Sequence, residues 1–209
     1  FRSILLFLTI PITLGISFLS VPIWKFFYGN SIYGPSVLSY NIFVGFFVSL
    51  FTALLIILQV LKEYKTIIIS LFIGFFIKLF FNRNMVLAFY HMNLPPYYGF
   101  ITASIVGYLF SISIYIGVLK VKYQLPLEKV INHFIDILCG CFLMIIILFI
   151  MKLFIPFVSD YSLVQLLLLL LYGVVGSVIY FSYTYVSGVT NRIFGKNTIM
   201  TFRKILFHK

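Results

Sequence analysis

Six apolar stretches, each long enough to cross a lipid bilayer, constrain the fold of this chain more than any other feature. They cover roughly residues 4–24, 38–61, 66–90, 99–119, 130–155 and 162–188. A bilayer core needs about 20 apolar residues in a helix. Short segments rich in glycine, proline, lysine or polar residues separate the stretches. We therefore predict an all-α, polytopic membrane helical bundle of six transmembrane helices within residues 1–188.

The composition supports an integral membrane protein and excludes an ordinary soluble domain. Hydrophobic residues make up 63% of the 209 residues and charged residues only 9%, whereas a soluble domain carries about 25% charged residues. The net charge of +11 does not indicate nucleic-acid binding, because that function needs cations gathered on one exposed face. Membrane lipids are the expected partners, and nucleic acid is not.

The positions of lysine and arginine predict the orientation, because positive residues in short loops favour the cytoplasmic side. Lys25 and Lys152 lie at one face of the predicted bundle. Eleven basic residues lie at the other face: Arg2, Lys62, Lys65, Lys120, Lys122, Lys129, Arg192, Lys196, Arg203, Lys204 and Lys209. We predict a multi-pass protein of the cell membrane with both ends of this chain, including the C-terminus, in the cytoplasm.

The basic segment 189–209 follows the last span and alternates cations with apolar residues. It would lie on the anionic inner leaflet as an amphipathic helix, where each cation near the surface contributes about 1 kcal/mol, or extend as a solvated cytoplasmic tail. The chain starts at Phe1 and not at a methionine. We therefore expect an upstream part of the same protein to precede it.

Lys78 is the most unusual residue, because it lies twelve residues after the start of the third span at Thr66. That distance is about 18 Å of helix rise, near the bilayer midplane. A lysine facing lipid there costs about 2.5 to 3.5 kcal/mol, so it should face the bundle interior or a watery cavity. Asn82 lies one turn further on the same face and is placed to accept a hydrogen bond. Arg83 is rotated about 140° from Lys78 at 100° per residue and is nearer the outer interface.

Two interpretations of Lys78 are open. It is either a buried structural ammonium satisfied by Asn82, carbonyls and water, or a charge that lines a passage for an anionic substrate. We name Lys78, Asn82 and Arg83 as candidate substrate-binding residues of a cavity.

His133 and Asp136 share a face in the first turns of the fifth span. Asp136 lies about 10 Å inside the cytoplasmic end and is the only acid within a span. It would pair with Lys78 across helices, take part in proton coupling together with His133, or balance Lys129 at the interface.

A stripe of small residues predicts close helix packing in the fourth span. Gly99, Ala103, Gly107 and Ser111 recur every four residues, and such stripes let another helix backbone approach closely in membranes. The last tyrosines of the sixth span are expected to belong to the cytoplasmic aromatic belt.

Catalytic constellations are absent from the sequence. We find no grouped serine, histidine and acid, no phosphate-binding glycine loop and no cluster with metal-ligand spacing. The chain is not expected to be an enzyme, and no metal or cofactor is expected.

Three segments together resemble one family of membrane transporters. The first, "LTIPITLGISFLSVPIWKFFYG" at residues 8–29, matches in Pro11, Gly15, Leu19, Pro22, Ile23 and Gly29. The second carries a lysine four residues before an asparagine, Lys78 and Asn82. The third, "GFITASIVGY", matches in Gly99, Ala103, Ser104, Gly107 and Tyr108, whereas Phe100 stands where the family has a small residue. The chain thereby resembles the polysaccharide exporters and lipid II flippases of the multidrug, oligosaccharidyl-lipid and polysaccharide flippase superfamily.

The resemblance implies that the six spans are the last six helices of a fourteen-helix flippase whose first half precedes Phe1. Such a protein would move a polyprenyl-pyrophosphate-linked glycan, either lipid II or a polysaccharide repeat unit, across the cytoplasmic membrane by alternating access. The headgroup would cross in a cationic cavity while the prenyl tail stays in lipid near the last two helices. A multidrug or small-cation exporter of the same superfamily and a non-transporting membrane scaffold subunit are the alternatives.

Overall fold

The secondary structure is entirely α-helical in the computed structural model, which describes residues 2–124, 128–157 and 163–190 and the side chains within 4–124, 135–157 and 163–190. The helices are α1 (Arg2–Phe18), α2 (Ser20–Tyr28), α3 (Gly34–Val60), α4 (Tyr64–His91), α5 (Tyr97–Val121), α6 (Glu128–Phe154) and α7 (Leu163–Val186). From α3 onward, each helix begins and ends within a few residues of a predicted span.

Five of these helices, α3 to α7, are long and apolar enough to cross a membrane. The pair α1 and α2 makes a sixth if the two are counted as one span. This set of helices is that of a multi-pass membrane protein, as the sequence predicted. Residues 191–209, which include nearly all of the predicted basic tail, lie outside the described residues.

The predicted first span, 4–24, is not one straight helix. The chain bends by 69° between α1 and α2, at Leu19. Pro22 causes the break, because it lacks a backbone N–H and its ring clashes with the carbonyl four residues earlier. Helical bonding resumes at once, since the Ile23 N–H donates to the Leu19 carbonyl at 3.0 Å. The nine residues of α2 rise about 14 Å, too little to cross a bilayer alone.

The chain forms two compact units. One consists of residues 16–127, and the other of residues 1–15 together with 128–209. The single bundle over 1–188 stays a prediction.

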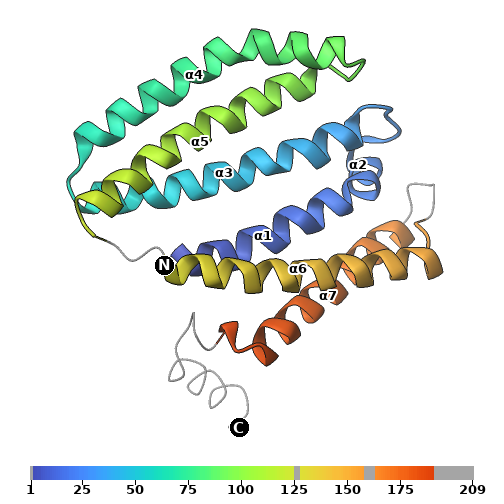
Figure 1. Cartoon of the computed structure of the whole chain (residues 1–209). Coiled ribbons are helices and arrows are strands. Elements are labelled where there is room, and N and C mark those ends of the chain that lie inside the picture. Colours follow the sequence, from blue (N-terminus) through green and yellow to red (C-terminus); the bar gives the residue numbers. More distant parts are fainter. Residues whose placement is uncertain (1, 125–127, 158–162, 191–209) are drawn as a thin grey trace. The chain divides into compact units, whose positions relative to one another are not determined.

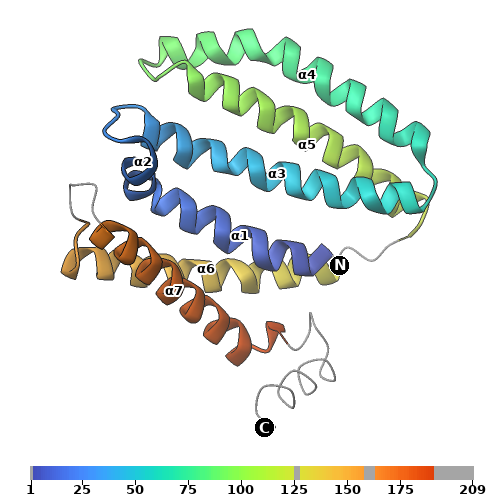
Figure 2. The ribbon, with the colours of Figure 1, turned by 180° about the vertical axis from the view of Figure 1, so that it is seen from behind.

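In the unit of residues 16–127, α5 lies between α3 and α4, as both views of the ribbon show (Figures 1 and 2). Its core lies where α3 meets α5 and includes Leu58, Tyr115 and Leu119, all fully buried. The rings of Phe51 and Tyr115 stack with centroids 5.2 Å apart. The central position of α5 makes it the helix that positions the other two.

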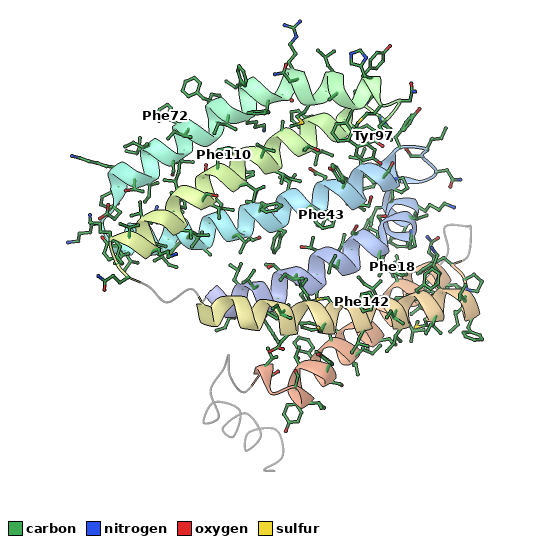
Figure 3. The ribbon with its side chains drawn as sticks, viewed as in Figure 1. Phe18, Phe43, Phe72, Tyr97, Phe110 and Phe142 are labelled. Atoms are coloured by element: carbon green, nitrogen blue, oxygen red, sulfur yellow. The ribbon has the colours of Figure 1, made fainter. Side chains whose placement is uncertain are left out.

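The two ends of this unit are tied by different chemistry. At one end, the Glu63 carboxylate in the α3–α4 turn accepts hydrogen bonds from Lys122 Nζ and, at 2.7 Å, from Tyr123 Oη just after α5. At the other end, the hydroxyls of Ser36 and Tyr97 lie 2.9 Å apart, with Tyr97 at the start of α5 (Figure 3). The Glu63 contacts thus bring together two segments that the sequence predicts to lie on the cytoplasmic side.

In the other unit, α6 packs against α7 and buried tyrosines of α7 hold the helices together. Pro11 cannot donate to the carbonyl of Phe7 four residues earlier. The Tyr180 hydroxyl donates to that carbonyl instead, at 2.7 Å. Tyr180 is only 1% exposed, so the expected aromatic belt at the membrane surface does not describe it. The Tyr172 hydroxyl likewise donates to the Ile155 carbonyl at 2.8 Å.

Lone hydroxyls along the apolar helices bond to carbonyls of their own helix. Thr13, Thr52 and Ser113, on α1, α3 and α5, each donate to the carbonyl four residues earlier at 2.7 to 2.8 Å. Such internal bonds satisfy polar side chains where no water is available.

Candidate functional site

A cavity of about 210 Å³ lies among α3, α4 and α5. Its lining consists of Phe51, Leu71, Gly74, Phe75, Lys78, Ser104, Gly107, Tyr108 and Ser111. Most of these groups are apolar or small, and Lys78 contributes the one charged side chain. An ammonium against a cavity wall made of hydrocarbon interacts strongly with an anion, because little water screens it.

The close approach of α4 and α5 builds one wall of this cavity. A Cβ added to Gly74 would lie 2.1 Å from Ser111 Oγ, and one added to Gly107 would lie 2.8 Å from the Gly74 carbonyl oxygen. The Ser111 hydroxyl donates across the seam to the Ser70 carbonyl at 2.9 Å. Only residues without a side chain fit at these two glycines, so the predicted stripe is the surface of α5 that meets α4.

All four residues of the predicted stripe are buried: Gly99, Ala103, Gly107 and Ser111. At Gly99 a Cβ would lie 2.5 Å from backbone atoms of Val86 in α4. The seam therefore extends from the start of α5 to the cavity.

The Lys78 side chain reaches from the seam toward the start of α5. A Cβ added to Gly107 would lie 3.2 Å from the Lys78 Cβ. The Lys78 ammonium lies 5.1 Å from the ring centroid of Phe100, a residue about two turns nearer the start of α5. The backbone of Lys78 is central in α4, but its charge is displaced toward the start of α5.

Asn82 does not satisfy the Lys78 ammonium. The Asn82 Oδ1 atom is buried and has no hydrogen-bond partner among the described residues. The prediction that Asn82 accepts a hydrogen bond from Lys78 is therefore wrong. One turn of helix aligns the two residues on a face, but the ammonium is directed at Phe100 instead.

Arg83 is exposed and, like Asn82, is not among the residues that line the cavity. Its rotation around α4 relative to Lys78 carries it out of the site. Of the three candidate substrate-binding residues, the structure brings only Lys78 to the cavity.

No carboxylate of the same unit neutralises Lys78. Glu63 is the only acid between residues 16 and 127, and it is engaged at the turn end of the unit. Hydrogen bonds from Lys122 and then from Tyr123 hold the pKa of Glu63 below its ordinary value. Within the described residues of this unit, the Lys78 ammonium forms no ion pair and no hydrogen bond, and the Phe100 ring is its contact.

The second group of candidate residues, His133 and Asp136, belongs to α6 in the other unit. Asp136 is half-buried, and the side chain of His133 lies outside the described residues. The predicted pairing of Asp136 with Lys78 joins the two units and stays a prediction. Among the described residues, no group of three or more histidine, cysteine, aspartate or glutamate side chains is placed to hold a metal ion.

The sequence did not predict a second cavity, of about 500 Å³, that α1 and α6 line. Its lining includes Leu14 of α1 and Ile135, Leu138, Phe142 and Leu143 of α6, and it contains no charged residue. Leu14 and the lining residues of α6 all belong to the unit of residues 1–15 and 128–209. The lining residues are apolar or cysteine, like most of the surrounding part of α6, so the sequence gives no signal for such a hollow.

Comparisons with family models, with curated proteins and with solved structures found no match to the chain. The resemblance to flippases therefore stays a prediction from the motifs.

Proposed function

We propose that this chain forms part of a membrane transporter that flips a polyprenyl-pyrophosphate-linked glycan across the cytoplasmic membrane. One observation carries the proposal, namely that Lys78 lines a cavity among the apolar helices α3, α4 and α5, and that no carboxylate of this unit pairs with it. Intramembrane charges are costly, and they commonly mark the path of a substrate or ion. The motif resemblance supports the same class of protein.

The chemistry of the cavity fits an anion better than a cation. Lys78 supplies positive charge and N–H donors, and Phe51 and Phe75 supply apolar walls. The hydroxyls of Ser104 and Ser111 already donate to backbone carbonyls. A pyrophosphate group would gain charge-assisted hydrogen bonds there. A cavity for a drug or other small cation would instead need an acid, and the cavity has none.

The apolar hollow on α6 is a suitable surface for the prenyl tail of the same substrate. In this proposal the tail stays in lipid against α6 while the headgroup crosses at the Lys78 cavity. Alternating access would involve a preceding half of the same protein, as the resemblance implies.

The test is flipping in proteoliposomes that contain the whole protein and a lipid-linked oligosaccharide with a fluorescent sugar. An impermeant quencher added outside reports how fast the label changes sides. We expect Lys78→Gln to slow flipping at least about tenfold, since a loss of about 1.4 kcal/mol in interaction energy gives that factor. Lys78→Arg, which keeps the charge, should retain most of the rate.

Lys120→Gln is the matched control, because Lys120 is exposed near the end of α5 and should not contact the substrate. Flipping that is unchanged in Lys78→Gln would overturn the proposal. A cation exporter would show the opposite pattern, in which Asp136→Asn abolishes transport and Lys78→Gln does not.

A further inference from the structure

We propose that the ring of Phe100 holds the Lys78 ammonium in a resting position and competes for it with an anion in the cavity. Phe100 would then determine how tightly the cavity binds anions. The inference rests on the proposed function, because it takes the Lys78 cavity to be an anion site.

The Lys78 side chain is in contact with both the cavity and the Phe100 ring. Lys78 lines the cavity together with Gly107 and Ser104, whereas Phe100 is not part of that lining. The ammonium nevertheless lies 5.1 Å from the Phe100 ring centroid. Lys78 thus lines the cavity, while its ammonium contacts a ring that is not part of the lining. In this inference, an anion that binds in the cavity draws the ammonium away from the ring.

The ring is suited to hold this charge without cancelling it. The face of an aromatic ring attracts a cation through its quadrupole, and the attraction grows where water is excluded. It is weaker than a charge-assisted hydrogen bond to a phosphate oxygen. A carboxylate at the same place would neutralise the ammonium and oppose anion binding, and the cavity of this unit offers none.

Phe100 also lies where its removal need not disturb the fold. Its side chain is 51% exposed, whereas its neighbours Gly99 and Ile101 are buried in the helix contacts. Phe100→Leu keeps an apolar side chain at this position and removes the ring face. Phe100→Tyr keeps the ring face and serves as the matched control.

The experiment measures the reactivity of individual lysines in the purified full chain in detergent. A small amine-acylating reagent is applied briefly, and peptide mass spectrometry gives the labelling rate of Lys78 relative to that of exposed Lys120. The same measurement is repeated over a titration with inorganic pyrophosphate. Circular dichroism melting of each variant confirms that the fold is retained.

We expect Phe100→Leu to raise the relative labelling rate of Lys78 several-fold and Phe100→Tyr to leave it unchanged. Pyrophosphate should protect Lys78 in the wild type. The concentration for half-protection should fall about 2- to 30-fold in Phe100→Leu, the range that corresponds to the strength of cation–π contacts.

The outcomes separate this inference from the proposed function. Protection by pyrophosphate with the same midpoint and the same labelling rate in wild type and Phe100→Leu would overturn the role of Phe100 and leave the anion site supported. Absence of protection in the wild type and in both variants would overturn the anion site, and with it the competition, whatever the labelling rates.

Discussion

Helices α5 and α7 are each held firmly within their own unit, but by opposite kinds of side chain. Along α5 the contacts with α4 are made at Gly99, Gly107 and Ser111, where the two backbones approach closely. Along α7 the buried residues include Tyr172 and Tyr180, whose hydroxyls donate to carbonyls of other segments. In lipid, where apolar surfaces gain little by leaving the solvent, both close van der Waals approach and interhelical hydrogen bonds drive association.

The difference shows that a glycine is needed for helix packing only where another helix lies close to it. A Cβ on Gly107 would collide with backbone, whereas Gly173 of α7 and Gly117 of α5 have no atom within 4 Å of an added Cβ. Four substitutions test this comparison, beginning with the largest expected effect.

Gly107→Leu should be the most damaging change. The added side chain would force α4 and α5 apart, since a Cβ alone would lie 2.8 Å from the Gly74 carbonyl oxygen. We expect a loss of about 3 kcal/mol in the free energy of unfolding, measured as the melting midpoint in detergent. Gly117→Leu in the same helix is the control and should not lose stability. Equal melting of both variants and the wild type would refute the seam.

Tyr180→Phe should have the next largest effect, because it removes the hydroxyl that bonds to the Phe7 carbonyl. Pro11 leaves that carbonyl without its usual helical donor. An unsatisfied buried acceptor costs about 1 to 3 kcal/mol. Tyr185→Phe, at a side chain that is 56% exposed, is the control and should melt like the wild type. If Tyr180→Phe does the same, ring packing and not the hydrogen bond holds α7.

Glu63→Gln should weaken the end of α5 modestly, because the carboxylate binds Lys122 and Tyr123 there. The pKa of Glu63 is lowered in the folded protein. Its stabilisation is therefore complete above the ordinary glutamate pKa of about 4.3 and is lost as the pH falls through the lower folded value. Melting followed from pH 6 to pH 3 should show an acid-dependent loss in the wild type that is smaller in Glu63→Gln. Identical pH profiles would contradict a role for the carboxylate.

The pKa of Lys122 is raised by its hydrogen bond to Glu63. Its contribution is therefore complete below the ordinary lysine value of about 10.4 and lost as the pH rises through the folded value. Both groups of this contact are therefore charged between about pH 4.3 and pH 10.4.

Gly173→Ala should have the smallest effect and sharpen the comparison most directly. The site is open, and alanine favours helix over glycine by up to about 1 kcal/mol. We expect an unchanged or slightly higher melting midpoint, whereas Gly107→Ala should lower it. If Gly173→Ala lowers the melting midpoint as much as Gly107→Ala does, the distinction between the open glycine of α7 and the close-packed glycine of α5 is wrong.

The sequence by itself determined the five helices α3 to α7 to within a few residues, because length and hydropathy suffice to identify a membrane span. It also located Lys78, since a charge within such a span stands out, and the stripe along α5, since small residues repeat at the helical period. The sequence also contains Pro22, but it did not predict the bend at Leu19. Proline within a membrane helix is compatible with many geometries, so only the structure shows the bend.

The tertiary structure alone decided which groups meet. Asn82 and Lys78 share a face of α4, yet the ammonium contacts Phe100 of α5 and Asn82 Oδ1 is left without a partner among the described residues. Tyr180 and Phe7, 173 residues apart in the chain, form one hydrogen bond. Such pairings depend on how each helix is rotated and how closely it approaches its neighbour. Hydropathy does not encode either quantity, because in lipid every apolar face of a helix is equally acceptable.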